Sequence, residues 1–404
     1  MQVLVVNSGS SSVKFELFSM DPERPLLRGE VERIGMPDPA LWVETVGPSV
    51  ERMSEAVSAR DHVEAMRAVL GALQSAPAPV DLQDVVAVGH RVVHGGTRFV
   101  APVHIDDEVL DGIRDLALLA PVHAKANVAG IEAAKVAFPH VSHIAVFDTA
   151  FHHTIPPVAR EYALPIEFAR AHGIRRYGFH GTSHGYVARR AAGLLGRQLT
   201  ELNLITMHLG NGASICALRD GKSVDTSMGM TPLEGLVMGT RCGDIDPAIP
   251  GLLGELTGAS REEINRTLNF ESGLMGLCGE SDMREVHRLV AAGDLEARLA
   301  LDMFCYRAKK YLGAYFAVLG RVDAIVFTAG VGENDAEVRA RICAGLERFG
   351  VTLDVRRNTS VPEPEQRERF IGTEGADVAV LVIPTDEEWE IARAAFECLN
   401  LARD

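Results

Sequence analysis

The chain has 404 residues, of which 47% are hydrophobic and 24% are charged, and its net charge is −15. This length provides for two or three domains with ordinary hydrophobic cores. The excess of acidic residues argues against a nucleic-acid partner and against binding to an anionic membrane surface, since both need basic surface. It does not exclude a small anionic substrate, because a locally positive site can form on an acidic protein.

Neither a membrane span nor a disulfide framework is predicted. The apolar run at 378–383 is too short to cross a bilayer, and the first residues lack the basic segment of a signal peptide. The six cysteines include no Cys-x-x-Cys pair, which indicates reduced thiols. We therefore expect a protein of the cytoplasm.

Two strand–turn–strand units of similar sequence are predicted far apart in the chain, at 3–18 and at 204–218. Each places a polar, glycine-containing turn between two apolar strands, and Gly9 and Gly210 occupy the same place in the two turns. The repetition suggests a duplicated domain. Small residues in such turns let the backbone approach phosphate oxygens.

Helices alternate with strands along the rest of the chain, which predicts an α/β fold. Ser183 is expected to cap the helix that follows it, and Thr385 with Glu388 fits a capping box. A strand at 322–328 leads into a glycine turn at 329–334, where a backbone can approach a nucleotide. The predicted helices span residues 122–137, 184–198, 295–319, 335–349 and 385–401.

The two commonest nucleotide-binding signatures are missing from the sequence. Cys216 stands where a Walker A loop ending at Gly221-Lys-Ser would need glycine, and no Gly-x-Gly-x-x-Gly precedes a helix. His180 and His184 have i, i+4 spacing but lack the glutamate of a zinc-protease helix. We expect His184 to be structural and His180 to face an anion.

Three charged residues are candidates for chemistry. Asp148 lies within an apolar run, where a carboxylate is costly unless it is paired or functional. Arg91 lies near the end of a predicted strand. It is either a functional group or a solvated charge on an edge strand. Arg241 presents a planar fork, either to an anion or to Asp244 and Asp246 behind it.

The chain resembles the acetokinase family over essentially its whole length. Val5–Lys14 and Leu204–Gly221 are similar to the two signature segments of that family. Four further segments also fit the family: Gly89–Gly96, Phe147–His152, Arg176–His184 and Met238–Asp246.

The resemblance implies an α/β fold of two duplicated ribonuclease H-like domains facing a central cleft, as in actin-like ATPases. The N-terminal domain is expected at 1–150 plus 385–404, with the last helix packed back on it, and the nucleotide-binding domain at 151–384. The resemblance also implies a homodimer. The implied reaction is reversible in-line transfer of the γ-phosphoryl group of ATP to acetate, which gives acetyl phosphate and ADP. Mg²⁺ is the implied metal, with Mn²⁺ as a substitute.

The same resemblance assigns site residues by the positions of the motifs. The catalytic residues are Asp148, His180 and Arg241. Arg91 is the contact for the substrate carboxylate, and the metal ligands are Asn7 and Glu387, although Glu387 by itself needs only to complement a helix dipole. The pocket for the acetate methyl group is formed by Val93, Val122, Phe179 and Pro232. The nucleotide contacts are Lys14, His208, Leu209, Gly210, Asn211, Gly212, Asp282, Met283, Arg284, Gly330, Val331, Gly332, Glu333 and Asn334.

A carboxylate acceptor is already ionised at neutral pH, so it needs no general base. We therefore expect Asp148 to orient Arg91, Arg241 or the waters of the metal. Two alternatives remain open. Val122 stands where the family has leucine, which leaves room for propionate or other short-chain acids. An actin- or chaperone-like ATPase switch or regulator would leave Arg91, His180 and Arg241 unexplained.

Overall fold

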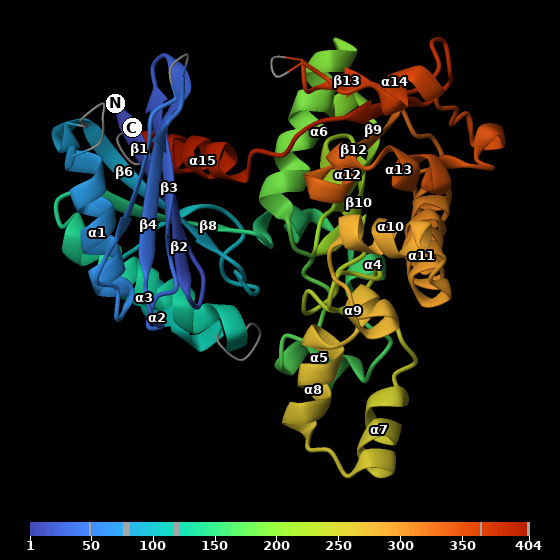
Figure 1. The fold of residues 1–404 in the computed structure, drawn as a ribbon, viewed down its shortest axis with the longest axis horizontal. Coiled ribbons are helices and arrows are strands. Elements are labelled where there is room, and N and C mark those ends of the chain that lie inside the picture. Colours follow the sequence, from blue (N-terminus) through green and yellow to red (C-terminus); the bar gives the residue numbers. More distant parts are fainter. Residues whose placement is uncertain (48–49, 76–80, 117–120, 364–365, 402–404) are drawn as a thin grey trace. The chain divides into compact units, whose positions relative to one another are not determined.

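The computed structural model describes residues 1–47, 50–75, 81–116, 121–363 and 366–401, without the side chains of 121–124 and 401. The chain divides into two compact units (Figure 1). Unit 1 consists of Met1–Phe151 and the C-terminal segment from Asp386, and unit 2 consists of His152–Thr385. Each unit is built around its own β-sheet.

The sheet of unit 1 has the order β5-β4-β3-β2-β1-β6-β8-β7 in the part that the structure describes. Neighbouring strands from β5 to β1 are antiparallel, whereas β1, β6 and β8 are parallel. The strands are β1 (Gln2–Ser8), β2 (Ser12–Met20), β3 (Glu23–Glu32), β4 (Ala40–Thr45), β5 (Arg52–Ala56), β6 (Val85–Val92), β7 (Val103–His104) and β8 (Ser142–Phe147). The helices are α1 (His62–Ser75), η1 (Leu82–Asp84), α2 (Asp107–Asp115), α3 (Pro121–Ala137) and α15 (Glu387–Leu401).

Helices cover both faces of this sheet, which explains why β1 is a continuous apolar run. Successive side chains of a strand point to opposite faces. Leu4 therefore packs with residues of α1, while Val5 packs with Ile391 and Ala395 of α15. The C-terminal helix thus completes the core of the N-terminal sheet.

The sheet of unit 2 has the order β11-β10-β9-β12-β14-β13 in its described part. The strands are β9 (Asn203–Leu209), β10 (Ala213–Arg219), β11 (Lys222–Thr226), β12 (Ala324–Thr328), β13 (Arg369–Phe370) and β14 (Ala379–Val382). The longer helices are α6 (Gly181–Leu195), α7 (Ile249–Thr257), α8 (Arg261–Phe270), α10 (Met283–Ala291), α11 (Leu295–Leu319) and α13 (Ala336–Cys343). The shorter ones are α4 (Pro157–Arg160), α5 (Ile166–Ala171), α9 (Gly273–Cys278), α12 (Ala329–Asn334), α14 (Val355–Thr359), η4 (Leu199–Glu201) and η5 (Glu347–Phe349). Another short helix, η3 (Ala150–Thr154), spans the junction of the two units.

The two sheets share one topology. The order β3-β2-β1-β6-β8 in unit 1 corresponds to β11-β10-β9-β12-β14 in unit 2. In both, three antiparallel strands are followed by two strands parallel to the first strand of the unit. This confirms the α/β class and the predicted duplication.

Two predicted helix caps are wrong. Helix α6 begins earlier, at Gly181, with His180 in the left-handed region at φ 56° before it, so Ser183 lies inside the helix. Helix α15 begins at Glu387, and Asp386 Oδ1 accepts a hydrogen bond from the amide of Trp389 at 2.9 Å. The hydroxyl of Thr385 instead donates to Ser183 Oγ at 2.8 Å. These side chains have tertiary partners that local spacing does not reveal.

The segment after β12 also differs from the prediction. Residues 329–334 form the short helix α12 instead of a turn. The helix predicted at 335–349 is divided into α13 and η5 around Gly345, whose φ is 77°. The predicted helix at 295–319 is confirmed, and it ends at Gly320 with φ 73°, where glycine is favoured.

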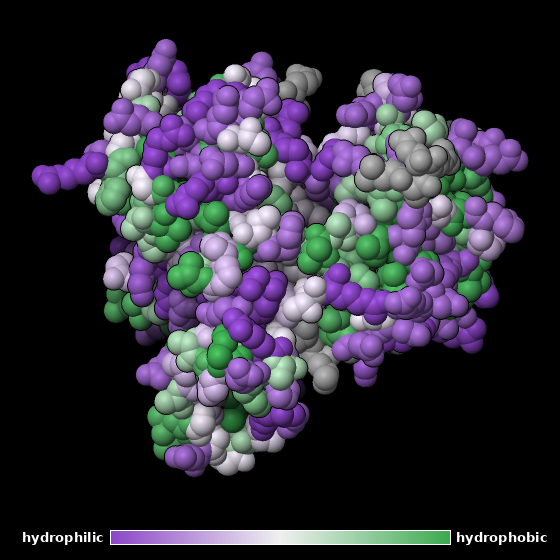
Figure 2. Space-filling model, turned by 180° about the vertical axis from the view of Figure 1, so that it is seen from behind, coloured by the Kyte–Doolittle hydropathy of each residue, from purple (hydrophilic) through white to green (hydrophobic). Residues whose placement is uncertain are grey.

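The surface carries hydrophilic residues over much of the face in Figure 2, with apolar residues in separate groups. One group belongs to α7, where Leu252 and Leu256 are 51% and 73% exposed. None of the helices in the described ranges has the length and apolar character that crossing a bilayer requires. The six cysteines are free thiols, as predicted.

Gly29 provides a test of the strand packing in unit 1. A Cβ there would lie 2.4 Å from the carbonyl oxygen of Trp42 and 2.5 Å from Phe15 Cζ. We expect Gly29→Ala to lower the free energy of unfolding by about 1–3 kcal/mol, because the sheet must shift. Both tryptophans, Trp42 and Trp389, belong to unit 1, so urea denaturation followed by tryptophan fluorescence reports on this unit.

Gly71→Ala is the matched control. Gly71 lies within α1, and its Cβ would have no neighbour within 4 Å. Because alanine is the better helix former, stability should stay the same or rise by up to about 1 kcal/mol. Equal destabilisation by both substitutions would contradict the packing at Gly29.

Candidate functional site

Arg91 and Asp148 form a partly buried ion pair at the carboxyl ends of the parallel strands in unit 1. Arg91 lies near the end of β6 and Asp148 directly follows β8, so the parallel pairing of these strands brings them together. Arg91 Nη2 is 2.6 Å from Asp148 Oδ2, and Nε is 3.2 Å from both carboxylate oxygens. The side chain of Asp148 is only 1% exposed. The guanidinium fork therefore compensates a carboxylate whose burial would otherwise cost free energy. The strand β6 lies between β1 and β8, so the interpretation of Arg91 as a solvated charge on an edge strand is wrong.

Glu387 belongs to the same group of charges. Its Oε2 lies 3.9 Å from Arg91 Nη2, and it occupies the first position of α15. Although burial works against the charge of Arg91, Asp148 and Glu387 raise its pKa above the ordinary value. Asn7 lies near the end of β1, opposite Lys14 of β2, at the same edge of the sheet.

The surroundings of Glu387 are acidic. Burial, together with the negative charges of Asp386 and Glu388, raises the pKa of Glu16 to about 8. Burial and Glu387 likewise raise the pKa of Glu388, while Arg91 and Lys14 oppose that shift. A cation placed beside these carboxylates would relieve their mutual repulsion.

The donor chemistry fits Mg²⁺ that arrives with a nucleotide. Asn7 and Glu387 supply amide and carboxylate oxygens, the ligands that Mg²⁺ prefers. Within the described residues, no group of three or more His, Cys, Asp or Glu side chains could hold a metal by itself. A magnesium ion that binds together with phosphate groups needs only one or two carboxylates, because the phosphates and water complete its shell.

In unit 2, His180 and Arg241 meet at the turn after β9. A Cβ at Gly212 would lie 3.5 Å from both Arg241 Nη1 and His180 Nε2. Because Gly212 has no side chain, the space beside the His180 imidazole and the Arg241 guanidinium stays open. The turn is joined to the loop of Arg241 by a hydrogen bond from the amide of Gly239 to the carbonyl of Asn211, at 2.9 Å.

Arg241 has no carboxylate of the described residues within ion-pair distance. Its Nη1 donates to the carbonyl of Pro232 at 3.1 Å, and burial lowers its pKa. The alternative, a pairing of Arg241 with aspartate, is not found among the described residues: Asp244 accepts from Tyr311 Oη and from the amide of Gly235, and Asp246 accepts from the amide of Ala248. The positive charge of Arg241 is therefore left for another anion.

A hydrogen-bonded chain holds His180 from behind. Ser214 Oγ lies 2.9 Å from His180 Nδ1 and 2.8 Å from His184 Nε2, and His184 Nδ1 lies 2.7 Å from Thr206 Oγ1. Burial, with the neighbouring His152 and His208, keeps the pKa of His184 well below its ordinary value. A neutral His184 carries a proton on only one of its ring nitrogens. The hydroxyl of Ser214 has a single proton and can donate it to only one of the two histidines, so the tautomer of His184 is linked to that of His180.

The ring of His180 is also stacked on His208. The two ring centroids are 4.1 Å apart with an interplanar angle of 22°. Ser183 Oγ is 2.8 Å from His208 Nδ1 and accepts from Thr385. Sequence reasoning missed Ser183 and Ser214 as supports, since their contacts come from other elements.

A cavity of about 1070 Å³ lies beside the turn after β9, within unit 2. Eight of the predicted nucleotide contacts line it: Gly210, Asn211, Asp282, Met283, Arg284, Gly330, Val331 and Asn334. Asp282 caps α10 and pairs with the exposed Arg284 at the rim. Lining residues that the sequence did not indicate include Leu274, Ser281, His287, Val290 and Phe304. The apolar ones give the cavity a wall suited to a flat, largely apolar group.

The other predicted nucleotide contacts lie elsewhere. Leu209 is buried in the core, and Lys14 belongs to unit 1. Glu333 does not line the cavity: its carboxylate accepts from the amide of Thr385 at 3.2 Å and pairs with Arg367 at 3.2 Å. Gly212 faces His180 and Arg241, His208 stacks on His180, and Gly332 is buried in α12.

The residues predicted for the methyl pocket are divided between the units. Val93 and Val122 belong to unit 1, whereas Phe179 and Pro232 belong to unit 2. The side chain of Val122 lies outside the described residues. The amide of Val93 donates to Asn127 Oδ1, and Asn127 Nδ2 donates to the carbonyl of Ser8, both at 3.2 Å. Sequence reasoning missed Asn127, which ties the ends of β6 and β1 to α3.

The two duplicated α/β units, with a glycine-lined cavity in unit 2, define the class of actin-like ATPase folds. A family model described as "Acetokinase family" matches residues 2–393, and the chain belongs to that family.

Relatives of known name support this assignment. The acetate kinase of Syntrophobacter fumaroxidans is 52% identical over 406 residues, which cover 100% of this chain and 98% of the relative. The acetate kinase of Streptomyces avermitilis is 51% identical over 401 residues, with 99% and 98% covered. Among solved structures, Porphyromonas gingivalis acetate kinase has a TM-score of 0.92 at 41% identity, covering 98% of this chain and 99% of its own. A propionate kinase from Francisella tularensis has a TM-score of 0.91 at 40% identity with the same coverage.

The buried His184 makes stability depend on pH. Its pKa is lower in the folded protein than in the unfolded chain, so the unfolded chain binds more protons below about pH 6.5. The free energy of unfolding should therefore fall as pH falls below that value and be independent of this group above it. We expect His184→Gln to reduce the slope between pH 5 and 6.5 by up to about 1.4 kcal/mol per pH unit. Urea titrations followed by circular dichroism measure the slope.

His172→Gln is the control, because His172 is exposed on the surface of unit 2. It should leave the slope unchanged. A slope that is the same in His184→Gln and in the parent protein would contradict a neutral buried His184.

Proposed function

We propose that the chain transfers the γ-phosphoryl group of ATP to acetate, reversibly, to give acetyl phosphate and ADP. Membership of the acetokinase family over residues 2–393 is the observation that carries the proposal. The relatives named acetate kinase at about half identity over the full length support it further. The cavity beside Gly210 and Gly330 is the proposed nucleotide site, and its volume suits a nucleotide.

Each charged group has a proposed role in bringing two anions together. Arg91 uses Nε and Nη2 for Asp148, which leaves Nη1 for the acetate carboxylate. His180 and Arg241 stabilise negative charge on the phosphoryl group during transfer, because donors fixed in advance cost no reorganisation. Asp148 fixes the guanidinium of Arg91 and removes no proton, since acetate is already ionised. Positioning and charge neutralisation supply the catalysis.

Asn7 and Glu387 are the proposed ligands of Mg²⁺, with Mn²⁺ as a substitute. When bound, the metal ion neutralises charge on the phosphates. The acidic surroundings formed by Glu16, Asp386 and Glu388 support a cation at this place. The proposed enzyme is a homodimer of the cytoplasm. The apolar side chains of Leu252 and Leu256 on α7 are exposed, which supports their burial against a second copy of the chain.

A kinase for propionate is the second candidate, supported by the similarity to the Francisella tularensis structure. The fold does not separate the two substrates, because the TM-scores are 0.92 and 0.91. One methylene group changes selectivity by only about 1–3 kcal/mol, so activity on both acids is expected.

The first test traps the product. With ATP, Mg²⁺, hydroxylamine and acetate, we expect the purified protein to form acetyl hydroxamate, with kcat/KM for acetate about tenfold above that for propionate. A higher value for propionate would favour the second candidate. Absence of acyl hydroxamate with either acid, in a protein that still hydrolyses ATP slowly, would indicate an ATPase switch instead.

The second test concerns the guanidinium of Arg91. Arg91→Lys keeps the positive charge but loses the planar fork that holds Asp148 and leaves Nη1 for substrate. We expect kcat/KM for acetate to fall by about 100-fold, mainly through KM for acetate, with KM for ATP little changed. Arg98→Lys is the control, since Arg98 pairs with the exposed Glu108. Equal effects on the KM values of both substrates would refute the assigned role.

The third test separates orientation from proton transfer at Asp148. Asp148→Asn should lower kcat by about 100-fold through misplacement of Arg91, without removing a limb of the pH–rate profile. Asp111→Asn, at an exposed carboxylate that pairs with Arg114, should change neither. Loss of the basic or acidic limb in Asp148→Asn would show that Asp148 exchanges a proton. A kcat and Mg²⁺ dependence equal to those of the parent enzyme would refute any essential role.

A further inference from the structure

The segment at 235–244, which contains Arg241, is closed into a loop by hydrogen bonds between its two ends. We call this segment the Arg241 loop and its closed end the neck. The amide of Asp244 donates to the carbonyl of Gly235 at 3.0 Å, and the amide of Gly235 donates to Asp244 Oδ1 at 2.9 Å. The two chain segments lie in close contact beside the neck, because a Cβ at Gly243 would lie 2.2 Å from the carbonyl oxygen of Leu236.

Two side chains of α11 hold the neck. Arg307 and Tyr311 are four residues apart, so they lie on the same face of this helix. Arg307 Nη1 donates to the carbonyls of Gly235 and Asp244, at 3.0 and 3.2 Å. Tyr311 Oη donates to Asp244 Oδ2 at 2.8 Å, and Arg307 Nη1 lies 3.5 Å from the same oxygen. Both ends of the Arg241 loop are therefore bonded to α11.

Tyr311 is suited to remain a donor. Burial, together with the negative charge of Asp244, raises the pKa of Tyr311 above its ordinary value, so the phenol keeps its proton at neutral pH. A hydrogen bond to an ionised acceptor is roughly twice as strong as one between neutral groups. The bond to Asp244 is thus a substantial part of the attachment of the neck.

The backbone beside Arg241 is held in a different way. The amide of Ser272 donates to the carbonyl of Thr240 at 3.0 Å, and the amide of Cys242 donates to the carbonyl of Leu268 at 3.1 Å. These bonds join the loop to the segment between α8 and α9. They involve main-chain atoms, whereas the attachment of the neck depends on side chains that a substitution can remove.

Helix α11 also reaches the proposed nucleotide site. Phe304, three residues before Arg307, lines the larger cavity of unit 2. The same helix packs against α9, whose Leu274 lines that cavity as well. The helix that holds the neck therefore forms part of the cavity wall, so it relates the position of Arg241 to that of a nucleotide.

We propose that Arg307 and Tyr311 are positioning residues, which act on phosphoryl transfer through Arg241. They fix both ends of the Arg241 loop on α11 and so keep the guanidinium of Arg241 beside Gly212, the place proposed for the transferred group. Displacing a group that stabilises the transition state lowers kcat without weakening the binding of substrates. This role rests on the proposed kinase function.

The first measurement is a separation of kcat from KM. Tyr311→Phe removes one hydroxyl, and we expect kcat to fall about tenfold, with the KM values for ATP and acetate little changed. Tyr306→Phe is the matched control and should change neither, because Tyr306 lies on the same helix and is 71% exposed. An unchanged kcat, or a fall in kcat/KM that arises only from KM, overturns the proposal.

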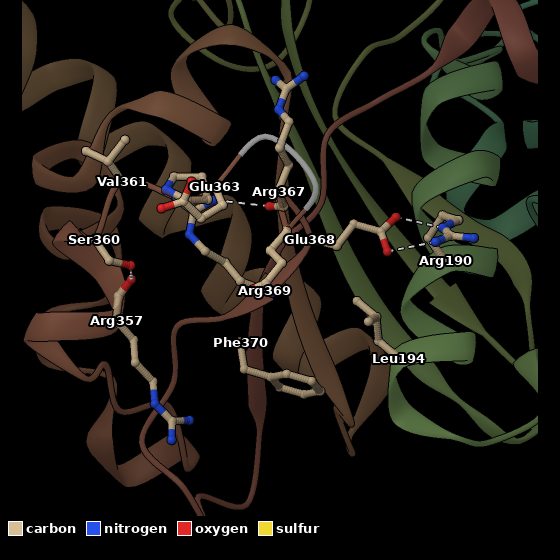
Figure 3. Close-up of a pocket in the computed structure, with 12 residues that line it drawn as sticks. Arg190, Leu194, Arg357, Ser360, Val361, Glu363, Arg367, Glu368, Arg369 and Phe370 are labelled. Atoms are coloured by element: carbon tan, nitrogen blue, oxygen red, sulfur yellow. Dashed lines mark hydrogen bonds and ion pairs between the residues drawn. The ribbon is translucent and has the colours of Figure 1, made fainter. Parts of the chain in front are cut away.

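Arg307→Lys provides a second variant if Tyr311→Phe folds poorly. It keeps the charge but loses the planar guanidinium that reaches two carbonyls, so kcat should again fall about tenfold. Arg190→Lys is its control and should leave kcat unchanged. Arg190 of α6 forms two bonds with Glu368, at 2.6 and 2.8 Å, on the surface of unit 2 (Figure 3). Equal effects of the two substitutions refute a specific role of Arg307.

A double-mutant cycle tests whether Tyr311 acts through Arg241. In an Arg241→Lys background the guanidinium is already lost, so Tyr311→Phe should then lower kcat less than about twofold. A general structural role of Tyr311 would lower kcat by the same factor in both backgrounds. Additive effects therefore refute the proposal.

Hydrogen exchange tests the attachment of the neck without any assay of activity. We expect the amides at 236–243 to exchange about tenfold faster in Tyr311→Phe than in the parent, with those of β9 and β10 unchanged. Unchanged exchange in the Arg241 loop refutes the attachment. If the parent protein transfers no phosphoryl group but its loop shows this faster exchange in the variant, the proposed function is wrong and the attachment of the loop is supported.

Discussion

The parallel alignment of the central strands is the constraint on which both candidate sites depend. In unit 1, β6 is parallel to β1 and to β8, so the carboxyl ends of all three strands meet at one edge of the sheet. That edge carries Asn7, Arg91 and Asp148, which are far apart in the sequence. In unit 2, the parallel pairing of β9 with β12 places the turn after His208 beside α12. A change of register in either sheet would separate these groups.

The two units differ in whether a buried charged side chain has an oppositely charged partner. In unit 1 the carboxylate of Asp148 is almost inaccessible, and the fork of Arg91 compensates it. In unit 2 the guanidinium of Arg241 is held by a backbone carbonyl and has no carboxylate partner within the described ranges. Compensated charge fixes geometry, whereas uncompensated charge beside an open glycine turn attracts an anion.

Neutral hydrogen bonds complete the support of the site. His184 is buried, which keeps its pKa well below the ordinary value, and Ser214 links its ring to that of His180. A charged residue in its place would add the cost of burying an ion, whereas a neutral imidazole can fix a ring orientation without that cost. Ser183 supports His208 in the same way. The hydroxyls that act here are small and fully enclosed, so they give little signal in a sequence.

The sequence by itself determined the α/β class, the duplication, the reduced thiols and the family, because hydrophobic periodicity and long motifs are local properties of the chain. It also indicated Asp148, His180 and Arg241 as informative residues, since an ionisable group in an apolar or glycine-rich segment is conspicuous. Only the tertiary structure decided which groups are partners: Arg91 with Asp148, Ser214 with His180, and Glu333 with Arg367. It also showed that α6 begins at Gly181 and α15 at Glu387, and that Ser183 and Thr385 form a hydrogen bond with each other instead of capping these helices. The physical reason is that side-chain hydrogen bonds depend on distances between segments that only strand pairing and packing bring together.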